Sequence, residues 1–137
     1  MNTDVVRGLR GYWHPVCAES DLEDGRLLPA TLLDEDIVVY RVGDDVLAVQ
    51  DLCIHRGTRL SLGTLRDDGC LVCPYHGWEY DVTGRCVRIP SLPEKNQHIP
   101  SRARVAAYAT ARRSGLVFVA HRPVTSSLRA PRPSRLA

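Results

Sequence analysis

The 137-residue sequence predicts an all-β fold, an antiparallel β-sandwich or partly open barrel that carries a smaller subdomain. Short runs rich in Val, Ile, Leu and Tyr recur along the chain, and turn sequences containing Gly, Asp or Pro separate them. No segment shows sustained helical periodicity, and no repeat of fixed period is present. These observations favour one domain built from many short strands.

The first half of the chain predicts the base of the sheet. A first strand is expected around His14, and further strands over residues 27–33, 36–42 and 46–51, where aliphatic side chains predominate. Gly43-Asp44-Asp45 separates the last two strands and is typical of a hairpin turn. We therefore expect these strands to pair as antiparallel neighbours.

The second half of the chain predicts shorter strands. They are expected over residues 70–73, 78–82, 85–89, 104–110 and 115–120. Asp67-Asp68-Gly69 is the expected turn into the first of them, and Thr83-Gly84 joins the next two as a hairpin. A looser segment with three prolines, residues 90–100, leads to the final pair.

Length and composition indicate one small cytoplasmic domain. A chain of 137 residues can bury a core but is too short for two ordinary domains. No apolar run is long enough to span a membrane, and the first 11 residues lack the apolar stretch of a secretory signal. Five cysteines without an even-numbered disulfide framework also favour a reducing compartment.

Charge is distributed unevenly along the chain. Residues 1–94 contain nine arginines and all 16 acidic residues, a net charge of −7, whereas residues 95–137 carry +9. Residues 122–137 combine four arginines with three prolines, a composition that cannot bury enough apolar surface to fold. This composition predicts a disordered basic tail over residues 122–137. The folded domain is therefore expected over residues 1–121. The tail is either a solvated end without function or an electrostatic docking segment for an acidic partner or a redox protein, and we expect no nucleic-acid binding.

Two short motifs each supply one cysteine and one histidine. They are Cys53-Ile54-His55 and Cys73-Pro74-Tyr75-His76, with 17 residues between them. Two cysteines and two histidines can hold a structural zinc ion, but Cys2His2 zinc fingers usually pair like with like. Mixed motifs suit an iron–sulfur cluster in which two thiolates bind one iron and two imidazoles bind the other. The candidate ligands are therefore Cys53, His55, Cys73 and His76, and a structural zinc module stays open as an alternative.

The sequences around these motifs carry a family resemblance. They are Tyr12-Trp13-His14-Pro15-Val16, His55-Arg56-Gly57-Thr58-Arg59-Leu60-Ser61-Leu62-Gly63 and Tyr75-His76-Gly77-Trp78-Glu79-Tyr80-Asp81. On these residues the chain resembles the Rieske 2Fe-2S family, and within it the N-terminal Rieske domain of Rieske non-haem iron oxygenases, over about residues 12–120. The resemblance implies a Rieske-type 2Fe-2S cluster as the cofactor, the Rieske (ISP) fold, and a cluster-binding subdomain over about residues 51–82.

The resemblance also bears on the reduction potential. Thr58 and Tyr75 occupy the positions at which high-potential, respiratory-type members carry a pair of disulfide-bonded cysteines. Trp78 stands where those members usually have a serine that donates a hydrogen bond to a cluster sulfur. Fewer hydrogen bonds to the reduced cluster imply a potential near the low end of the Rieske range, about −150 mV.

The chain lacks a recognisable second iron site. Oxygenase large subunits hold a mononuclear iron with two histidines and a carboxylate, whereas only His14, His98 and His121 remain here, and no acidic residue follows Glu94. We therefore expect no catalytic residue in this chain. The resemblance implies an electron-transfer protein, monomeric alone, that passes single electrons from a reductase to a separate oxygenase or other catalytic subunit. The alternative is the Rieske domain of an oxygenase whose catalytic domain is absent from the chain.

Overall fold

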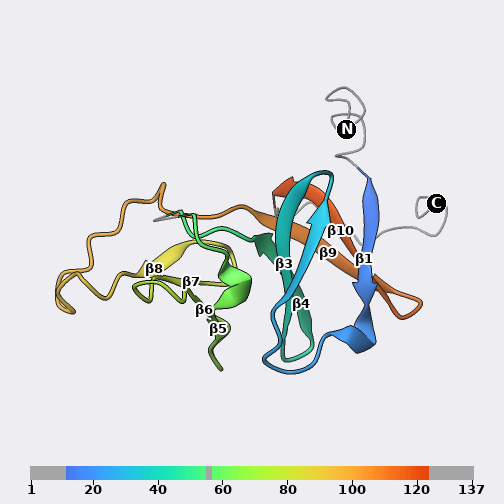
Figure 1. The fold of residues 1–137 in the computed structure, drawn as a ribbon, viewed down its shortest axis with the longest axis horizontal. Helices are drawn as coiled ribbons and strands as arrows, with labels where there is room; N and C mark the ends of the chain where they lie inside the picture. The colour runs from blue at the N-terminus through green and yellow to red at the C-terminus, as the bar shows by residue number, and fades with distance from the viewer. Residues whose placement is uncertain (1–11, 55–56, 124–137) are drawn as a thin grey trace.

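The computed structural model describes residues 12–54 and 57–123, which form two antiparallel sheets (Figure 1). The larger sheet contains β1 (Trp13–Ala18), β2 (Leu28–Leu32), β3 (Glu35–Val42), β4 (Asp45–Gln50), β9 (Ala107–Arg113) and β10 (Leu116–Pro123). The smaller sheet contains β5 (Thr64–Leu65), β6 (Leu71–Val72), β7 (Glu79–Tyr80) and β8 (Cys86–Arg88). Two short 3-10 helices, η1 (Glu19–Asp21) and η2 (Leu60–Leu62), complete the described elements.

The larger sheet is a nearly closed barrel. Its strand order is β1-β10-β9-β4-β3-β2, and the two edge strands β1 and β2 contact each other. All its pairs are antiparallel, including the β3–β4 hairpin in which Val42 lies opposite Asp45 across the predicted turn. The predicted all-β fold with a partly open barrel and a smaller subdomain is therefore confirmed.

Strand β3 connects the two hydrophobic cores of the molecule. Its residues Ile37 and Val39 belong to the core inside the barrel, whereas Val38 and Tyr40 belong to the core shared with the small sheet. Successive side chains of a strand point to opposite faces, so a continuous apolar run is required where both faces are covered. All four residues are fully buried. The small sheet is thus packed against the outside of the barrel rather than joined to it only by loops.

One predicted strand is wrong in its position. The strand expected over residues 104–110 is β9, Ala107–Arg113, because the preceding residues pair with the small sheet instead. The amide of Cys86 donates to the carbonyl of Ala103 (2.9 Å), and the amide of Val105 donates to the carbonyl of Gly84 (2.8 Å). The three-residue segment 103–105 therefore fastens the small sheet to the barrel before the chain returns to it.

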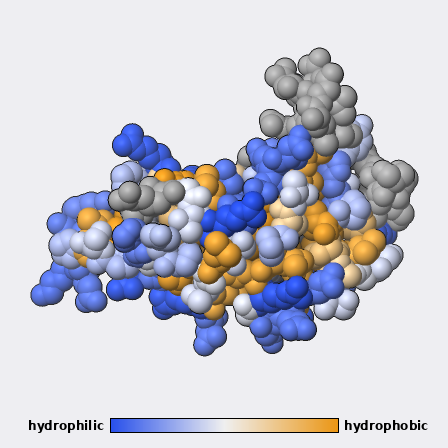
Figure 2. Space-filling view, in the orientation of Figure 1, coloured by the Kyte–Doolittle hydropathy of each residue, from blue (hydrophilic) through white to orange (hydrophobic). Residues whose placement is uncertain are grey.

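The short elements β5, η1 and η2 were not predicted, because two or three residues are too few to show a period. In the part of the chain that the structure describes, no helix has the length and apolar character needed to cross a bilayer. The basic tail predicted over residues 122–137 lies almost wholly outside the described residues, and the predicted ligand His55 lies outside them too. Both therefore stay predictions. Figure 2 shows hydrophilic residues projecting from the edges of the molecule and hydrophobic ones gathered toward its middle.

Candidate metal centre

Two loops next to the small sheet carry the two predicted cysteine ligands. The first loop follows β4 and ends at η2, and the second joins β6 to β7. In each loop the cysteine amide donates a hydrogen bond to the carbonyl five residues later, Cys53 to Thr58 (2.7 Å) and Cys73 to Trp78 (2.8 Å). The same backbone bond therefore closes both loops, although they come from different parts of the chain.

Left-handed backbone turns shape the histidine end of each loop. Gly57 has a φ of +73°, and His76 and Gly77 have φ values of +60° and +71°. A residue with a Cβ atom in this region costs roughly 1–2 kcal/mol, so the surrounding contacts must hold His76 in place. The closed loop therefore fixes the backbone conformation at His76, and with it the direction in which the side chain leaves the backbone.

The two cysteine thiols are buried in the same core. Cys53 and Cys73 are 0% and 2% exposed, and both belong to the core cluster between the small sheet and the barrel. Burial raises the pKa of Cys73 to about 11, opposed by a hydrogen bond from the Tyr75 amide and increased further by the neighbouring Cys53 thiol. A metal ion binding here must therefore displace thiol protons, as thiolate ligands require. Two adjacent buried sulfur atoms fit the sulfur side of a Rieske-type cluster.

Tyr80 was not singled out as a site residue from the sequence, yet its hydroxyl reaches the centre. It is fully buried on β7, and its oxygen lies 3.2 Å from the Sγ of Cys53. The amide of Ile54 also donates to this oxygen, and burial together with Cys53 raises the pKa of the phenol. The hydroxyl therefore stays protonated and can donate its proton to a Cys53 thiolate. The only signal in the sequence was an aromatic residue within the strand that follows the second ligand loop.

Of the two predicted histidine ligands, the structure describes His76. His76 is exposed, and its ring lies edge-on to the Tyr75 ring with centroids 5.7 Å apart. His55 lies outside the described residues, and among those that are described no three His, Cys, Asp or Glu side chains group as metal ligands. The structure thus brings Cys53 and Cys73 together in the interior and places His76 at the surface.

A shallow hollow lies beside the ligand loops. Its volume is about 320 Å³, and its lining is apolar except for one arginine: Ile54, Trp78, Ile89, Pro100, Arg102 and Ala103. Trp78 is half-buried and packs against the core, whereas Tyr75 is 60% exposed. Of these two aromatic residues, only Trp78 therefore shields the interior near the loops from water.

The remaining cysteines do not extend the centre. All five cysteines of the chain are unpaired. Burial, with the nearby Asp68 carboxylate, raises the pKa of Cys70 to about 11, and burial also raises the pKa values of Cys17 and Cys86. Thiols with raised pKa values are protonated at neutral pH and react slowly. Cys86 is buried, and Cys17 and Cys70 are half-buried, so none of the three has the low pKa and full exposure of a reactive thiol.

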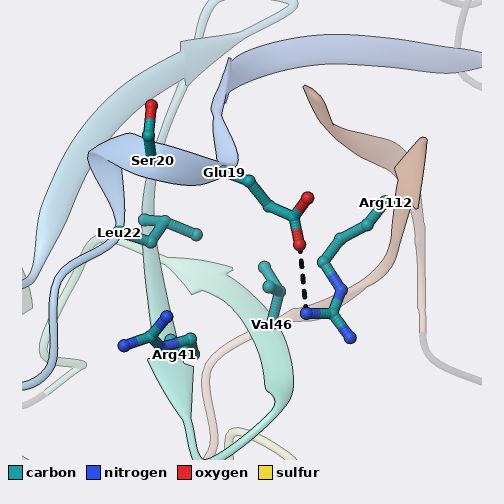
Figure 3. A pocket seen from close by; sticks show the side chains of 6 residues that line it. All are labelled: Glu19, Ser20, Leu22, Arg41, Val46 and Arg112. Atoms are coloured by element: carbon teal, nitrogen blue, oxygen red, sulfur yellow. Dashed lines mark hydrogen bonds and ion pairs between the residues drawn. The ribbon is translucent and has the colours of Figure 1, made fainter. Parts of the chain in front are cut away.

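A second hollow lies on the barrel, away from the ligand loops. Its volume is about 260 Å³, and it is lined by Glu19, Ser20, Leu22, Arg41, Val46 and Arg112 (Figure 3). Arg112 reaches across it to Glu19 (3.1 Å), and Arg41 pairs with Asp24 (2.7 Å). Each arginine already has a carboxylate partner, and no predicted site residue lines this hollow.

Comparison with known proteins agrees with the geometry. The sequence model described as "Rieske [2Fe-2S] domain" matches residues 12–109. Methylxanthine N1-demethylase NdmA of Pseudomonas putida is 41% identical over 116 residues, which are 81% of this chain and 32% of that protein. Methylxanthine N3-demethylase NdmB of the same organism is 35% identical over 119 residues, 81% of this chain and 33% of that protein.

Solved structures show the same likeness. The NdmA structure superposes with a TM-score of 0.79 at 39% identity, over 88% of this chain and 37% of that one. The structure of dicamba monooxygenase gives a TM-score of 0.75 at 33% identity, over 90% of this chain and 37% of that one. The chain spans about a third of the length of these relatives.

Fold, buried cysteine pair and matched sequence together define an iron–sulfur domain. The chain belongs to the Rieske 2Fe-2S domain family and resembles the N-terminal Rieske domain of Rieske oxygenases. Its cofactor is therefore a Rieske-type 2Fe-2S cluster.

Proposed function

We propose that this domain transfers single electrons through a 2Fe-2S cluster held by Cys53 and Cys73 on one iron and by His55 and His76 on the other. The observation that carries the proposal is the pair of buried thiols on two loops closed by the same backbone hydrogen bond. The bound cluster supplies reversible one-electron chemistry. The protein supplies the ligands, the protection of the sulfur side from water, and a surface histidine on the other side.

Each part of the protein has a distinct task in this proposal. The barrel holds the small sheet through β3 and the 103–105 segment, and the small sheet in turn positions the second loop between β6 and β7. The Tyr80 hydroxyl lies 3.2 Å from the Cys53 sulfur, and it donates a hydrogen bond to this sulfur when Cys53 binds the cluster as a thiolate. The exposed position of His76 gives a redox partner close access to the histidine side.

We further propose that the domain works in an oxygenase system. Its relatives include two N-demethylases and dicamba monooxygenase, each about two and a half times as long as this chain. These relatives favour the hypothesis that the chain is the Rieske domain of an oxygenase, and they disfavour a stand-alone electron carrier. The catalytic iron is then supplied from outside the chain. Its partners are then a reductase as the electron donor and a catalytic subunit or domain as the acceptor. We propose a cytoplasmic location and a monomeric state for the chain alone.

Metal analysis tests the proposed function directly. Anaerobically purified protein is expected to contain two irons and two acid-labile sulfides per chain, and to give the EPR signal of a mixed Cys/His cluster after dithionite reduction. Zinc without sulfide would instead establish the structural zinc alternative. Substrate oxidation by the chain alone with a reductase and oxygen would contradict the assignment of the catalytic iron to another domain or subunit.

Replacing Tyr80 with Phe is expected to lower the reduction potential by about 40 mV. A hydrogen bond to sulfur stabilises the reduced cluster more than the oxidised one, and a difference of about 1 kcal/mol corresponds to this shift for one electron. Protein-film voltammetry of wild type and Y80F measures the change. Tyr12→Phe is the matched control, because Tyr12 is 56% exposed. Equal potentials for Y80F and wild type would show that the Tyr80 hydroxyl does not tune the cluster.

A further inference from the structure

Asp51 is a buried acidic residue at the start of the first ligand loop. It follows β4 directly, and it is 3% exposed. Both oxygens of its carboxylate accept hydrogen bonds from a single residue, Ser61. Oδ1 accepts from the Ser61 amide (2.7 Å), and Oδ2 accepts from the Ser61 hydroxyl (2.6 Å). Carboxylate hydrogen bonds of this length are strong, and a pair of them fixes orientation as well as distance.

The two partners stand at opposite ends of the loop that carries Cys53. The Asp51 amide donates to the carbonyl of Asp36 on β3 (2.9 Å), which holds this end of the loop on the barrel. Ser61 lies within η2, beside the fully buried Leu60, which belongs to the same core as Cys53. The Asp51–Ser61 contact therefore joins the barrel end of the loop to its small-sheet end.

Asp51 differs from Glu79, the other buried acidic residue among those described. Glu79 forms ion pairs with Arg66 and with Arg88 (3.0 Å), so its charge has cationic partners. No Lys, Arg or His of the described part of the chain forms an ion pair with Asp51. A buried carboxylate without a cation is costly unless its hydrogen bonds are good. Among the described residues, Ser61 supplies both hydrogen bonds of the Asp51 carboxylate, which makes the contact between them a strong tie.

We propose that Asp51 is the positioning residue of the first ligand loop. Through Ser61 it fixes the separation of the loop's two ends, and this holds Cys53 in the geometry that retains the cluster. The inference rests on the proposed function, because it concerns the loop as a source of ligands. Asp51 itself is not a ligand.

The test compares five proteins: wild type, D51N, S61A, S61T and D24N. D51N removes the charge and keeps the side-chain shape, whereas S61A removes one hydrogen bond and leaves Asp51 unchanged. S61T restores the hydroxyl. D24N is the control, since the Asp24 side chain is 89% exposed and pairs with Arg41 on the barrel. Each protein is purified anaerobically, and loss of visible absorbance after addition of a chelator gives the rate of cluster loss. Voltammetry then gives the reduction potential.

D51N and S61A are expected to lose the cluster about 10–100-fold faster than wild type, the usual range for residues that orient metal ligands. S61T and D24N should match wild type. The potential should rise in D51N, because a buried negative charge has been removed, and should not rise in S61A, which keeps that charge. D51N and S61A should thus lose the cluster equally fast but differ in reduction potential. This combination distinguishes a positioning role from a general loss of stability.

Two results would overturn the inference. One is a rate of cluster loss in S61A equal to that of S61T, which decides the matter even if D51N does not fold. The other is a potential in D51N equal to that of D24N. A wild-type protein with zinc and no sulfide would instead contradict the proposed function, so the two failures are distinguishable.

Discussion

Cys73→Ala protein is expected to contain no 2Fe-2S cluster and to be colourless after purification. Cys73 is a buried thiol on a loop closed by a backbone hydrogen bond, and its thiol lies beside that of Cys53. A cluster that ties two loops together also contributes to their order, so its loss should expose both loops. Iron and sulfide analysis measures the first effect, and hydrogen exchange of residues 52–62 and 73–78 measures the second. His76→Ala should behave in the same way.

Two control variants test whether the effect is specific to the ligands, because each removes a cysteine or a histidine that is not a predicted ligand. Cys17→Ala removes a half-buried thiol in β1, and His98→Ala removes an exposed imidazole in the loop after β8. Both proteins should retain full iron and sulfide content. If Cys73→Ala retained a cluster with an unchanged EPR signal, or if Cys17→Ala lost it, the assignment of the ligands would be wrong.

Gly63→Ala is expected to lower the free energy of unfolding by about 3 kcal/mol, the upper part of the range for overpacked sites. Gly63 follows η2 at the end of the first ligand loop, and a Cβ atom there would lie 1.9 Å from the carbonyl oxygen of Val72. Val72 directly precedes Cys73, so this close approach packs one ligand loop against the strand that leads into the other. An added methyl group must push the two loops apart. Chemical denaturation followed by circular dichroism measures the effect.

Gly43→Ala is the control for this variant. Gly43 has a φ of +60° in the β3–β4 turn, and a Cβ atom added there would meet nothing within 4 Å. It should cost about 1 kcal/mol, the strain of a left-handed alanine alone. It should also leave the cluster content unchanged, whereas G63A should reduce it. Equal stability losses in G63A and G43A would show that the contact with Val72 does not constrain the loops.

The sequence was sufficient to predict most strands of the barrel because their signals are local. The Ile37-Val38-Val39-Tyr40 run predicted a buried strand, and Gly43-Asp44-Asp45 predicted the hairpin that follows it. The position of β9 could not be predicted in this way. Residues 103–105 have the apolar alternation of a strand, but they pair with Gly84 and Cys86 in a hairpin about 20 residues earlier in the chain.

The candidate ligands could be predicted from the sequence alone, because the cluster requires a cysteine and a histidine at short spacing in each of two loops, and the identity of the side chains is enough to recognise this pattern. Only the tertiary structure revealed which residues support them. Asp51 and Ser61 are ten residues apart in the chain, and Tyr80 and Cys53 are 27 apart. Gly63 lies against the backbone of Val72 in β6. Such contacts depend on how the barrel and the small sheet pack, and no periodicity or motif in the chain encodes them locally. The sequence therefore predicted which side chains bind iron, and the packing of the two sheets decided how the described parts of the loops that carry them are held.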